Sequence, residues 1–304
     1  MNDYAKINFS DLVAAKGTYY FLSVAKKVKA ITILINANFF SNTFYWGKML
    51  NIIILELKRL NIESFIYILE EDKPVDLSDK RFSSDAFIFI GAKRESAISQ
   101  ITALKKPHIF IDPIKEQAQS TIVSHDNFAA GYKCAKIFYD MGHLTFCFLD
   151  ADSRSLSYEK RYNGFASFLT QNKIEDFPRI SPMTEAKNIS DIYNFSDILK
   201  LSKRPTAFFC ASDFILLSAF SMFKKLNLSV PEDISIISFD NSNPHDIDNI
   251  SVDSFGISVV NMALTALYIL LIYIDSGTIS LPMDICIDTI LVKRGSVKNP
   301  KEVL

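Results

Sequence analysis

The sequence predicts a doubly wound α/β fold, and two observations support this. Short runs of β-branched and aromatic residues alternate with longer segments of helical periodicity, a pattern typical of βα units and a parallel sheet. Many of the runs are almost continuously apolar, and parallel strands of that kind are covered by helices on both faces. Because the chain has 304 residues, about two domains of ordinary size are expected.

Several of the expected strands end on a polar residue. The eight expected strands are residues 31–36, 64–69, 86–91, 108–112, 121–126, 145–150, 206–212 and 234–240. Helices are expected between them, at residues 44–60, 94–105, 127–140, 158–172, 188–200, 213–226 and 257–274. Asp126 or Asn127, Ser157 and Ser212 are placed to cap three of these helices, because short polar side chains accept hydrogen bonds from free N–H groups of the first turn.

Composition excludes several classes of protein. The formal net charge of -1 provides no global basic field that would attract nucleic acid or anionic lipid. The nine glycines form no GxGxxG or GxxxxGK[ST] loop, so no nucleotide cofactor is expected. The four cysteines lie far apart without a CxxC pair, and we expect buried, reduced thiols and no metal site.

Two segments bear on cellular location. The first residues, MNDYAKINFSDLV, lack the basic and apolar regions of an export signal, so a cytoplasmic location is expected. Residues 257–274 contain 18 residues without a charge, which is close to the length of a membrane span. Asn261, Ser258 and Thr265 weaken that alternative. A helix that is apolar all round is also expected where one face meets the core and another meets a partner subunit.

Ligands of open α/β sheets bind outside the carboxyl ends of the strands. The polar residues that end the expected strands are therefore the first candidates for a site. They are Asn36, Asp112, Asp150, Ser212 with Asp213, and Asp240 with Asn241.

Five stretches, taken in order, resemble the LacI/GalR family of transcription regulators. They are HDNFAAGYKCAKIFYDMGH (125–143), SLSYEKRYNGF (155–165), TAFFCASDFILLSAF (206–220), LNLSVPEDISIISFDN (226–241) and LVKRGS (291–296). The resemblance covers roughly residues 29–296. It implies a type I periplasmic binding protein-like fold, with two doubly wound parallel-sheet lobes, three crossovers between the lobes, and a small ligand clamped in the cleft.

The same resemblance implies a division of the chain. The first lobe is expected to contain residues 29–124 plus 255–281, and the second lobe residues 125–254 plus 282–304. Residues 1–28 are expected to be an N-terminal remnant or linker segment.

Arg161 and Asp240 are the main ligand-binding candidates that the resemblance implies. Arg161 matches the family arginine that grips ligand hydroxyls or a carboxylate, and a guanidinium can bind two acceptors side by side. The alternative is a surface arginine paired with Glu159. Asp240 matches an acidic residue that accepts hydroxyl hydrogen bonds, and it could also pair with Arg161 or cap the next turn.

Two further candidates depart from the family pattern. Asn241 replaces the more common second aspartate. Ser212 stands where the family often has asparagine, and it could simply cap the helix that follows. Because of these departures, the ligand of a particular sugar repressor cannot be assigned to this chain from the resemblance.

The resemblance also implies ligand contacts from the first lobe. Asp112 matches a position that faces the ligand, and Phe44, Tyr45 and Trp46 follow the first strand where family members place side chains against it. An aromatic ring suits the apolar face of a sugar. The alternative for these three aromatic residues is ordinary core packing.

The sequence favours a binding protein over an enzyme. It contains no convincing Ser, His and Asp set and no paired carboxylates in separated environments. His143 resembles a family loop residue, for which we expect a structural role.

The N-terminus is short for the DNA-binding domain that the family normally has. Residues 9–17, FSDLVAAKG, are faintly similar to the family's first DNA-binding helix, but TYYFLSVAKKV follows where the recognition helix is expected. Operator DNA is therefore expected as a partner only if a complete helix-turn-helix is present.

Together these observations predict the effector-sensing core of a LacI/GalR-type regulator, without a cofactor or a membrane partner. The effector is expected to be a sugar. The alternative is a stand-alone cytoplasmic sugar-binding protein without DNA-binding activity. A homodimer is expected from the family and from the excess of apolar residues in 44–60 and 257–274.

Overall fold

The computed structural model describes residues 6–40, 43–70, 73–117, 119–150, 155–180, 204–242 and 251–300, except for the side chains of 38, 40, 43 and 44. The helix expected at 188–200 lies outside the described residues. The chain forms two compact units. The first comprises Met1–His125 and Ser258–Asp288, and the second comprises Asp126–Ile257 and Thr289–Leu304.

The chain passes between the units three times. The last passage follows Asp288, whereas the resemblance placed it after residue 281. The difference is strand β11 (Met283–Ile287), which pairs with β5 (Thr121–His125) in the first unit. The N-terminal residues that were expected to form a separate segment belong to the first unit.

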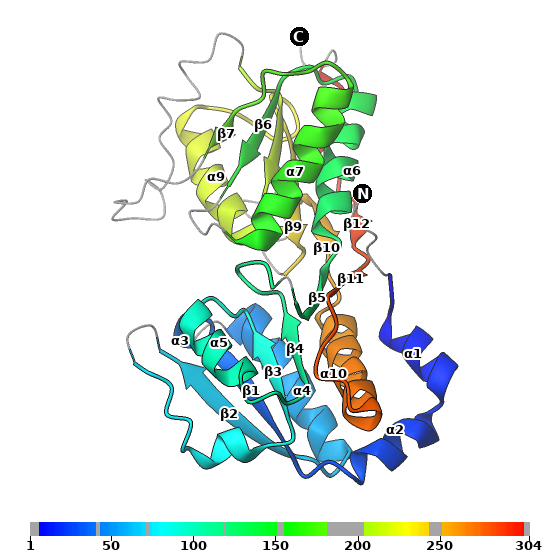
Figure 1. Ribbon diagram of the computed structural model, residues 1–304. Helices are drawn as coiled ribbons and strands as arrows, with labels where there is room; N and C mark the ends of the chain where they lie inside the picture. Colours follow the sequence, from blue (N-terminus) through cyan, green and yellow to red (C-terminus); the bar gives the residue numbers. More distant parts are fainter. Residues whose placement is uncertain are drawn as a thin grey trace. The chain divides into compact units, whose positions relative to one another are not determined.

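The first unit is built on a six-stranded parallel sheet in the order β11-β5-β4-β3-β1-β2 (Figure 1). The remaining strands are β1 (Ala30–Asn36), β2 (Glu63–Leu69), β3 (Ala86–Ile90) and β4 (His108–Ile111). Its longer helices are α4 (Lys48–Arg59), α5 (Glu95–Thr102) and α10 (Val259–Ser276), and its short ones are α3 (Ala37–Phe40), a π-helix (Thr43–Gly47) and a 3-10 helix (Lys80–Ser83).

The second unit has a sheet in the order β12-β10-β9-β8-β6-β7. All its pairs are parallel except that of β12 with β10. The strands are β6 (Phe146–Leu149), β7 (Arg179–Ile180), β8 (Ala207–Cys210), β9 (Ser235–Asp240), β10 (Asp253–Gly256) and β12 (Ile290–Val292). Its described helices are α6 (Asn127–Asp140), α7 (Leu156–Gln171) and α9 (Asp213–Lys225).

The predicted doubly wound class is confirmed, and each expected strand is present within two residues at either end. Strands β7, β10, β11 and β12 were missed. Strand β10 shows why, because its sequence DSFG has one apolar side chain in four residues and no recognisable alternation. Strand β10 is defined by its hydrogen-bonded neighbours β9 and β12 rather than by its own sequence.

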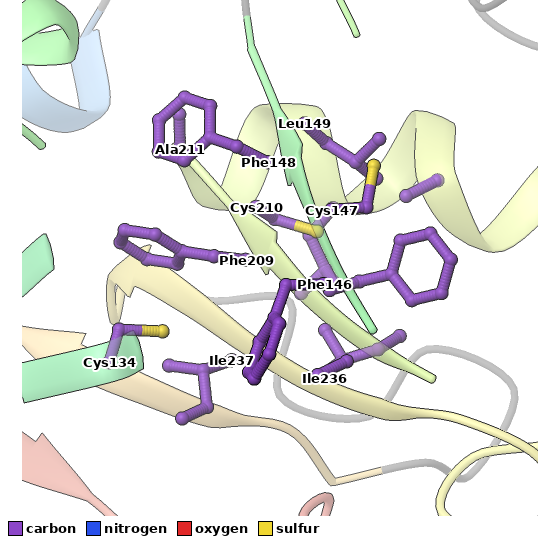
Figure 2. Close-up of a cluster of buried hydrophobic side chains, with 14 of the residues drawn as sticks. Cys134, Phe146, Cys147, Phe148, Leu149, Phe209, Cys210, Ala211, Ile236 and Ile237 are labelled. Carbon is purple, nitrogen blue, oxygen red and sulfur yellow. The ribbon is translucent and has the colours of Figure 1, made fainter. Parts of the chain in front are cut away.

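The core of the second unit is unusually aromatic (Figure 2). Phe148 contacts Phe165 and Phe209 at ring-centroid distances of 5.9 and 5.4 Å. Cys147 and Cys210 are buried in the same cluster, and burial raises the pKa of each thiol. Thiols that stay protonated are poor nucleophiles and poor metal ligands, which agrees with the structural role predicted for the cysteines.

Helices α6 and α7 lie side by side with their backbones in contact (Figure 1). A Cβ atom on Gly131 would lie 1.9 Å from the carbonyl oxygen of Arg161, and one on Gly164 would lie 2.0 Å from that of Phe128. Any larger residue at either position must push the helices apart. This contact fixes the backbone that carries Arg161.

Helices α1 (Phe9–Lys16) and α2 (Thr18–Ala25) pack against α10. The ring of Tyr268 on α10 is contacted edge-on by Phe9 and Phe21, at centroid distances of 4.8 and 4.4 Å. Asp275, near the end of α10, accepts hydrogen bonds from Tyr20 and Lys27.

This packing explains the apolar character of α10. The helix is long and apolar enough to cross a membrane, but 61% of it is buried inside the structure. A partner subunit is therefore not needed to account for the apolar composition of α10. The apolar residues of 257–274, which we took above as support for a homodimer, do not provide that support.

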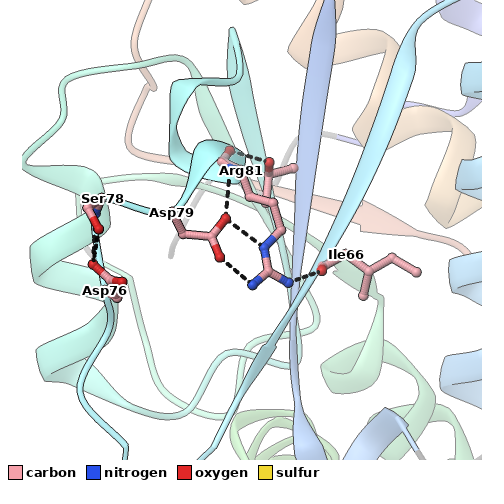
Figure 3. A network of polar contacts seen from close by, with 6 residues as sticks. Ile66, Asp76, Ser78, Asp79 and Arg81 are labelled. Carbon is pink, nitrogen blue, oxygen red and sulfur yellow. Dashed lines mark hydrogen bonds and ion pairs between the residues drawn. The ribbon is translucent and has the colours of Figure 1, made fainter.

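The open edge of β2 is covered by the segment that follows it (Figure 3). Arg81 donates a hydrogen bond of 2.9 Å to the carbonyl oxygen of Ile66 and forms a two-pronged ion pair with Asp79. Its guanidinium lies 4.5 Å from the ring centre of Tyr67. These contacts satisfy part of an edge that could otherwise pair with another strand.

His143 is a structural residue, as expected. It lies before β6 with an exposed fraction of 1%, and its ring nitrogens lie 2.8 Å from Thr206 Oγ1 and 2.9 Å from Ser235 Oγ. Burial lowers its pKa to about 4 from the usual 6.5. The ring is therefore neutral in the folded protein at neutral pH.

Acid should weaken the second unit through His143. Because the folded pKa lies below the unfolded one, the unfolded chain binds more protons between pH 6.5 and 4, and stability falls as the pH falls. We expect the stability advantage of the wild type over His143→Gln to shrink by about 2 kcal/mol between pH 7.5 and 4.5 in urea unfolding. An advantage that does not change with pH would contradict this assignment.

Candidate functional site

The carboxyl edge of the second sheet brings together three of the predicted residues. Strands β8 and β9 are parallel neighbours, so their ends meet at the same edge. Ser212 follows β8, Asp240 is the last residue of β9, and Asn241 comes next. Arg161, on α7, reaches the same edge, where it donates a hydrogen bond to the carbonyl oxygen of Ala211.

Arg161 is buried, with an exposed fraction of 5%. Its Nε donates to Asn127 Oδ1 at 2.8 Å, and its guanidinium carbon lies 3.5 Å from the ring centre of Phe239 and 5.0 Å from that of Tyr158. An arginine offers five N–H donors. Bonds to Asn127 and Ala211 use two, so three have no hydrogen-bond partner within the described part of the chain.

The pairing alternatives for Arg161 are resolved. Glu159 accepts hydrogen bonds from Arg179, so Arg161 is not a surface arginine paired with Glu159. The hydrogen bonds of Arg161 among the described residues go to Asn127 and Ala211 rather than to Asp240. Asn127, which we considered above as a helix cap, is therefore a partner of Arg161, and Asp126 caps α6 by accepting from Ala129 N–H.

Asp240 is half-buried and has a backbone φ of 99°. A non-glycine residue in that region is strained, and such residues concentrate at functional sites. Asp240 directly follows Phe239, on whose ring the guanidinium of Arg161 lies.

Ser212 is the N-cap of α9, and its hydroxyl oxygen accepts a hydrogen bond from Ile215 N–H at 3.4 Å. The cap that we considered as an alternative is therefore present. The hydroxyl proton of Ser212 is a separate donor, so capping and ligand contact are chemically compatible.

Asp213 is buried at the start of α9 and organises the edge. It accepts hydrogen bonds from the hydroxyls of Ser238 and Ser254 and from the backbone N–H of Ser242, the last at 2.7 Å. One carboxylate thus ties α9 to β9, β10 and the turn that follows β9. Sequence reasoning noted Asp213 but could not identify its serine partners.

Asn241 is held from two sides. Its backbone N–H donates to Ser254 Oγ at 3.1 Å, and its side-chain oxygen accepts from Arg294 at 2.6 Å. Arg294 was missed as a contributor to this edge, although the stretch LVKRGS that contains it was one of the five that carried the resemblance.

Asp150, at the end of β6, also has a partner that the sequence did not predict. It is buried, and Arg179 on β7 donates a hydrogen bond of 2.7 Å to its carboxylate. Arg179 lies 4.4 Å from the ring centre of Tyr162.

In the first unit, Asp112 follows β4 with a φ of 44° and accepts a hydrogen bond of 3.1 Å from the Tyr45 hydroxyl. Trp46 is buried and stacks on Phe39 at a centroid distance of 4.6 Å, the core packing that we considered as its alternative role. The side chain of Phe44 lies outside the described residues. Tyr45 is thus joined to the predicted site residue Asp112, and its ring also contacts Trp46 at a centroid distance of 4.7 Å.

Among the described residues, no three His, Cys, Asp or Glu side chains form a group that could hold a metal ion. The polar groups described at these edges are hydrogen-bonding groups, with donors on Arg161 and acceptors on carboxylates.

Comparisons with known proteins place the chain in a family. The family described as the periplasmic binding protein-like domain matches residues 135–297. The HTH-type transcriptional repressor PurR of Actinobacillus pleuropneumoniae serotype 3 is 31% identical over 196 residues, which is 64% of this chain and 58% of that protein. The ribose operon repressor of Haemophilus influenzae is 24% identical over 138 residues, 45% of this chain and 42% of that protein. The chain thus spans about half the length of these curated relatives.

Solved structures share the fold. A LacI family transcriptional regulator from Enterococcus faecium with bound ribose has a TM-score of 0.73 at 19% identity, over 89% of this chain and 99% of that chain. The lac repressor dimer bound to operator also has a TM-score of 0.73, at 16% identity over 92% and 98%. The CelR–cellobiose complex has a TM-score of 0.70 at 15% identity, over 88% and 84%. The chain therefore belongs to the periplasmic binding protein-like domain family.

Proposed function

We propose that the chain is the effector-sensing core of a LacI/GalR-type transcription regulator and that its effector is a sugar. The observation that carries the proposal is Arg161, a buried guanidinium at a strand edge with three N–H groups that no described residue uses. Burying a charge is costly unless it is well hydrogen-bonded. A ligand that supplies acceptors can form the hydrogen bonds that the described protein groups do not form with these three N–H groups.

Sugar hydroxyls suit both units because each hydroxyl donates and accepts. Arg161 offers donors, and Asp240 and Asp112 offer carboxylate acceptors. The Tyr45 hydroxyl that binds Asp112 orients that carboxylate. A ribose-bound regulator and a cellobiose-bound regulator share the fold, which supports a sugar without selecting one.

Ser212 and Asn241 remain proposed ligand residues. Ser212 accepts a hydrogen bond as the helix cap and keeps its hydroxyl proton as a donor. Asn241 accepts a hydrogen bond from Arg294 and keeps its NH2 group as a donor. Each can therefore donate to a sugar hydroxyl without losing its present contact. No cofactor, catalytic step or membrane partner is proposed.

Replacing Arg161 should strongly weaken ligand binding. We expect Arg161→Ala to weaken, by about 100-fold or more, the binding of whichever sugar of ribose, cellobiose, glucose and galactose binds the wild type, because charged hydrogen bonds are lost. Isothermal titration calorimetry measures this directly. Arg81→Ala, in the first unit, is the control and should leave the affinity unchanged, whereas an unchanged affinity in Arg161→Ala removes Arg161 from the site.

We also propose a symmetric homodimer. Leu55 on α4 and Phe214 on α9 are large apolar side chains that are 66% and 61% exposed, so a partner subunit would find apolar surface to bury on both helices. The lac repressor, which shares the fold, is a dimer.

Light scattering at micromolar concentration should show a dimer for the wild type and a monomer for Leu55→Asp combined with Phe214→Asp. Leu144→Asp is the matched control, because Leu144 is 71% exposed and lies outside both helices. A monomeric wild type would overturn the proposal.

The packing of α1 and α2 favours a second candidate, a stand-alone sugar-binding protein. Helix α2 buries Phe21, Val24 and Ala25 and packs against α10, so it is part of the first unit rather than of a separate helix-turn-helix. We expect this chain not to shift its own upstream DNA in a gel assay, with or without a bound sugar. A sequence-specific shift would show that these 304 residues read DNA and would dismiss the second candidate.

A further inference from the structure

The turn after β9 is strained at two consecutive residues. Asp240 has a φ of 99° and Asn241 a φ of 48°, and neither is glycine. Left-handed conformations of this kind cost free energy and persist where surrounding contacts hold them. A carboxylate at such a turn keeps its direction only if its neighbours along the chain are fixed.

Arg294 fixes the residue that follows Asp240. Its Nη2 donates to Asn241 Oδ1 at 2.6 Å, and its Nη1 donates to the carbonyl oxygen of Val252 at 2.9 Å. The guanidinium therefore bridges the β9 turn and the chain that enters β10. A lysine or an apolar residue could not make both contacts with this planar geometry.

The backbone of Arg294 is itself held by a buried carboxylate. Asp253 Oδ1 accepts hydrogen bonds from the backbone N–H groups of Arg294, Gly295 and Ser296, at 2.6, 2.8 and 3.2 Å. Gly295 has a φ of 94°, which is the conformation that curls these N–H groups around one oxygen. Arg294 thus projects from a rigid loop.

The same turn is anchored on its other side by Asp213. Ser254 accepts from the backbone N–H of Asn241 and donates to Asp213, which also accepts from the backbone N–H of Ser242. Both residues after Asp240 are therefore held by charged groups that belong to other elements. Arg294 is the one that acts on the side chain of Asn241.

We propose that Arg294 is a positioning residue, which holds Asn241 and so directs the Asp240 carboxylate toward a ligand without contacting the ligand itself. The proposal rests on the proposed function, because it takes Asp240 as a ligand acceptor. It also explains why asparagine at position 241 is adequate, since a neutral amide oxygen can accept from Arg294 while its NH2 group remains a donor.

The first test measures the turn without any ligand. In Arg294→Met, hydrogen exchange of the Asn241 and Ser242 amides, followed by NMR on the full chain, should be at least about tenfold faster than in the wild type, because one charged hydrogen bond is lost. Arg179→Met is the matched control, since it also removes a partly buried, hydrogen-bonded arginine of the second unit, and it should leave both amides unchanged. Unchanged exchange in Arg294→Met overturns the proposal.

The second test asks whether Arg294 acts through Asp240, with D-ribose as the probe. Arg294→Met should weaken ribose binding about tenfold in the wild-type background and have no effect in the Asp240→Asn background. An equal loss in both backgrounds would mean that Arg294 merely supports the unit, and this would overturn the proposal. If ribose does not bind the wild type, a ribose effector is excluded, and amide exchange alone decides whether Arg294 holds the turn.

Discussion

The structure depends on how the second unit accommodates the positive charge of Arg161 in its interior. The guanidinium lies on the ring of Phe239 and donates to Asn127 and to the carbonyl oxygen of Ala211, so residues from α6, α7, β9 and the end of β8 surround it. The close approach of α6 and α7 at Gly131 fixes the position of the Arg161 backbone relative to α6. A guanidinium held in this way is preorganised, so a ligand meets donors whose conformational entropy has already been lost.

The strand edge around Arg161 is rigid because carboxylates and arginines outside the proposed ligand contacts hold it. Asp213 gathers the hydroxyls of Ser238 and Ser254, and Asp253 fixes the loop that carries Arg294. In a buried, low-dielectric region, such hydrogen bonds are strong, and a fully satisfied network specifies one conformation. The strained turn at Asp240 is therefore compatible with a stable unit.

The sequence was sufficient for the α/β class and the principal strands, because apolar runs are local signals. The choice of Arg161 came from the family resemblance, and its contact with a ligand stays a prediction. The sequence failed where structure depends on distant partners. Strand β10 has no apolar pattern, Arg294 lies 53 residues from Asn241, and the apolar surface of α10 is covered by helices at the opposite end of the chain. Trp46 and Tyr45 are adjacent, yet one packs in the core and the other binds Asp112, a distinction that helical spacing alone cannot make.

The most direct test of this account is the NMR signal of the Arg161 side chain, in protein labelled with 15N-arginine and titrated with a sugar that calorimetry shows to bind. The account predicts that the Nη resonances shift and slow their exchange with water, while the Nε resonance, bonded to Asn127, moves little. Saturation with the sugar while the Nη resonances stay unchanged would show that the ligand binds elsewhere.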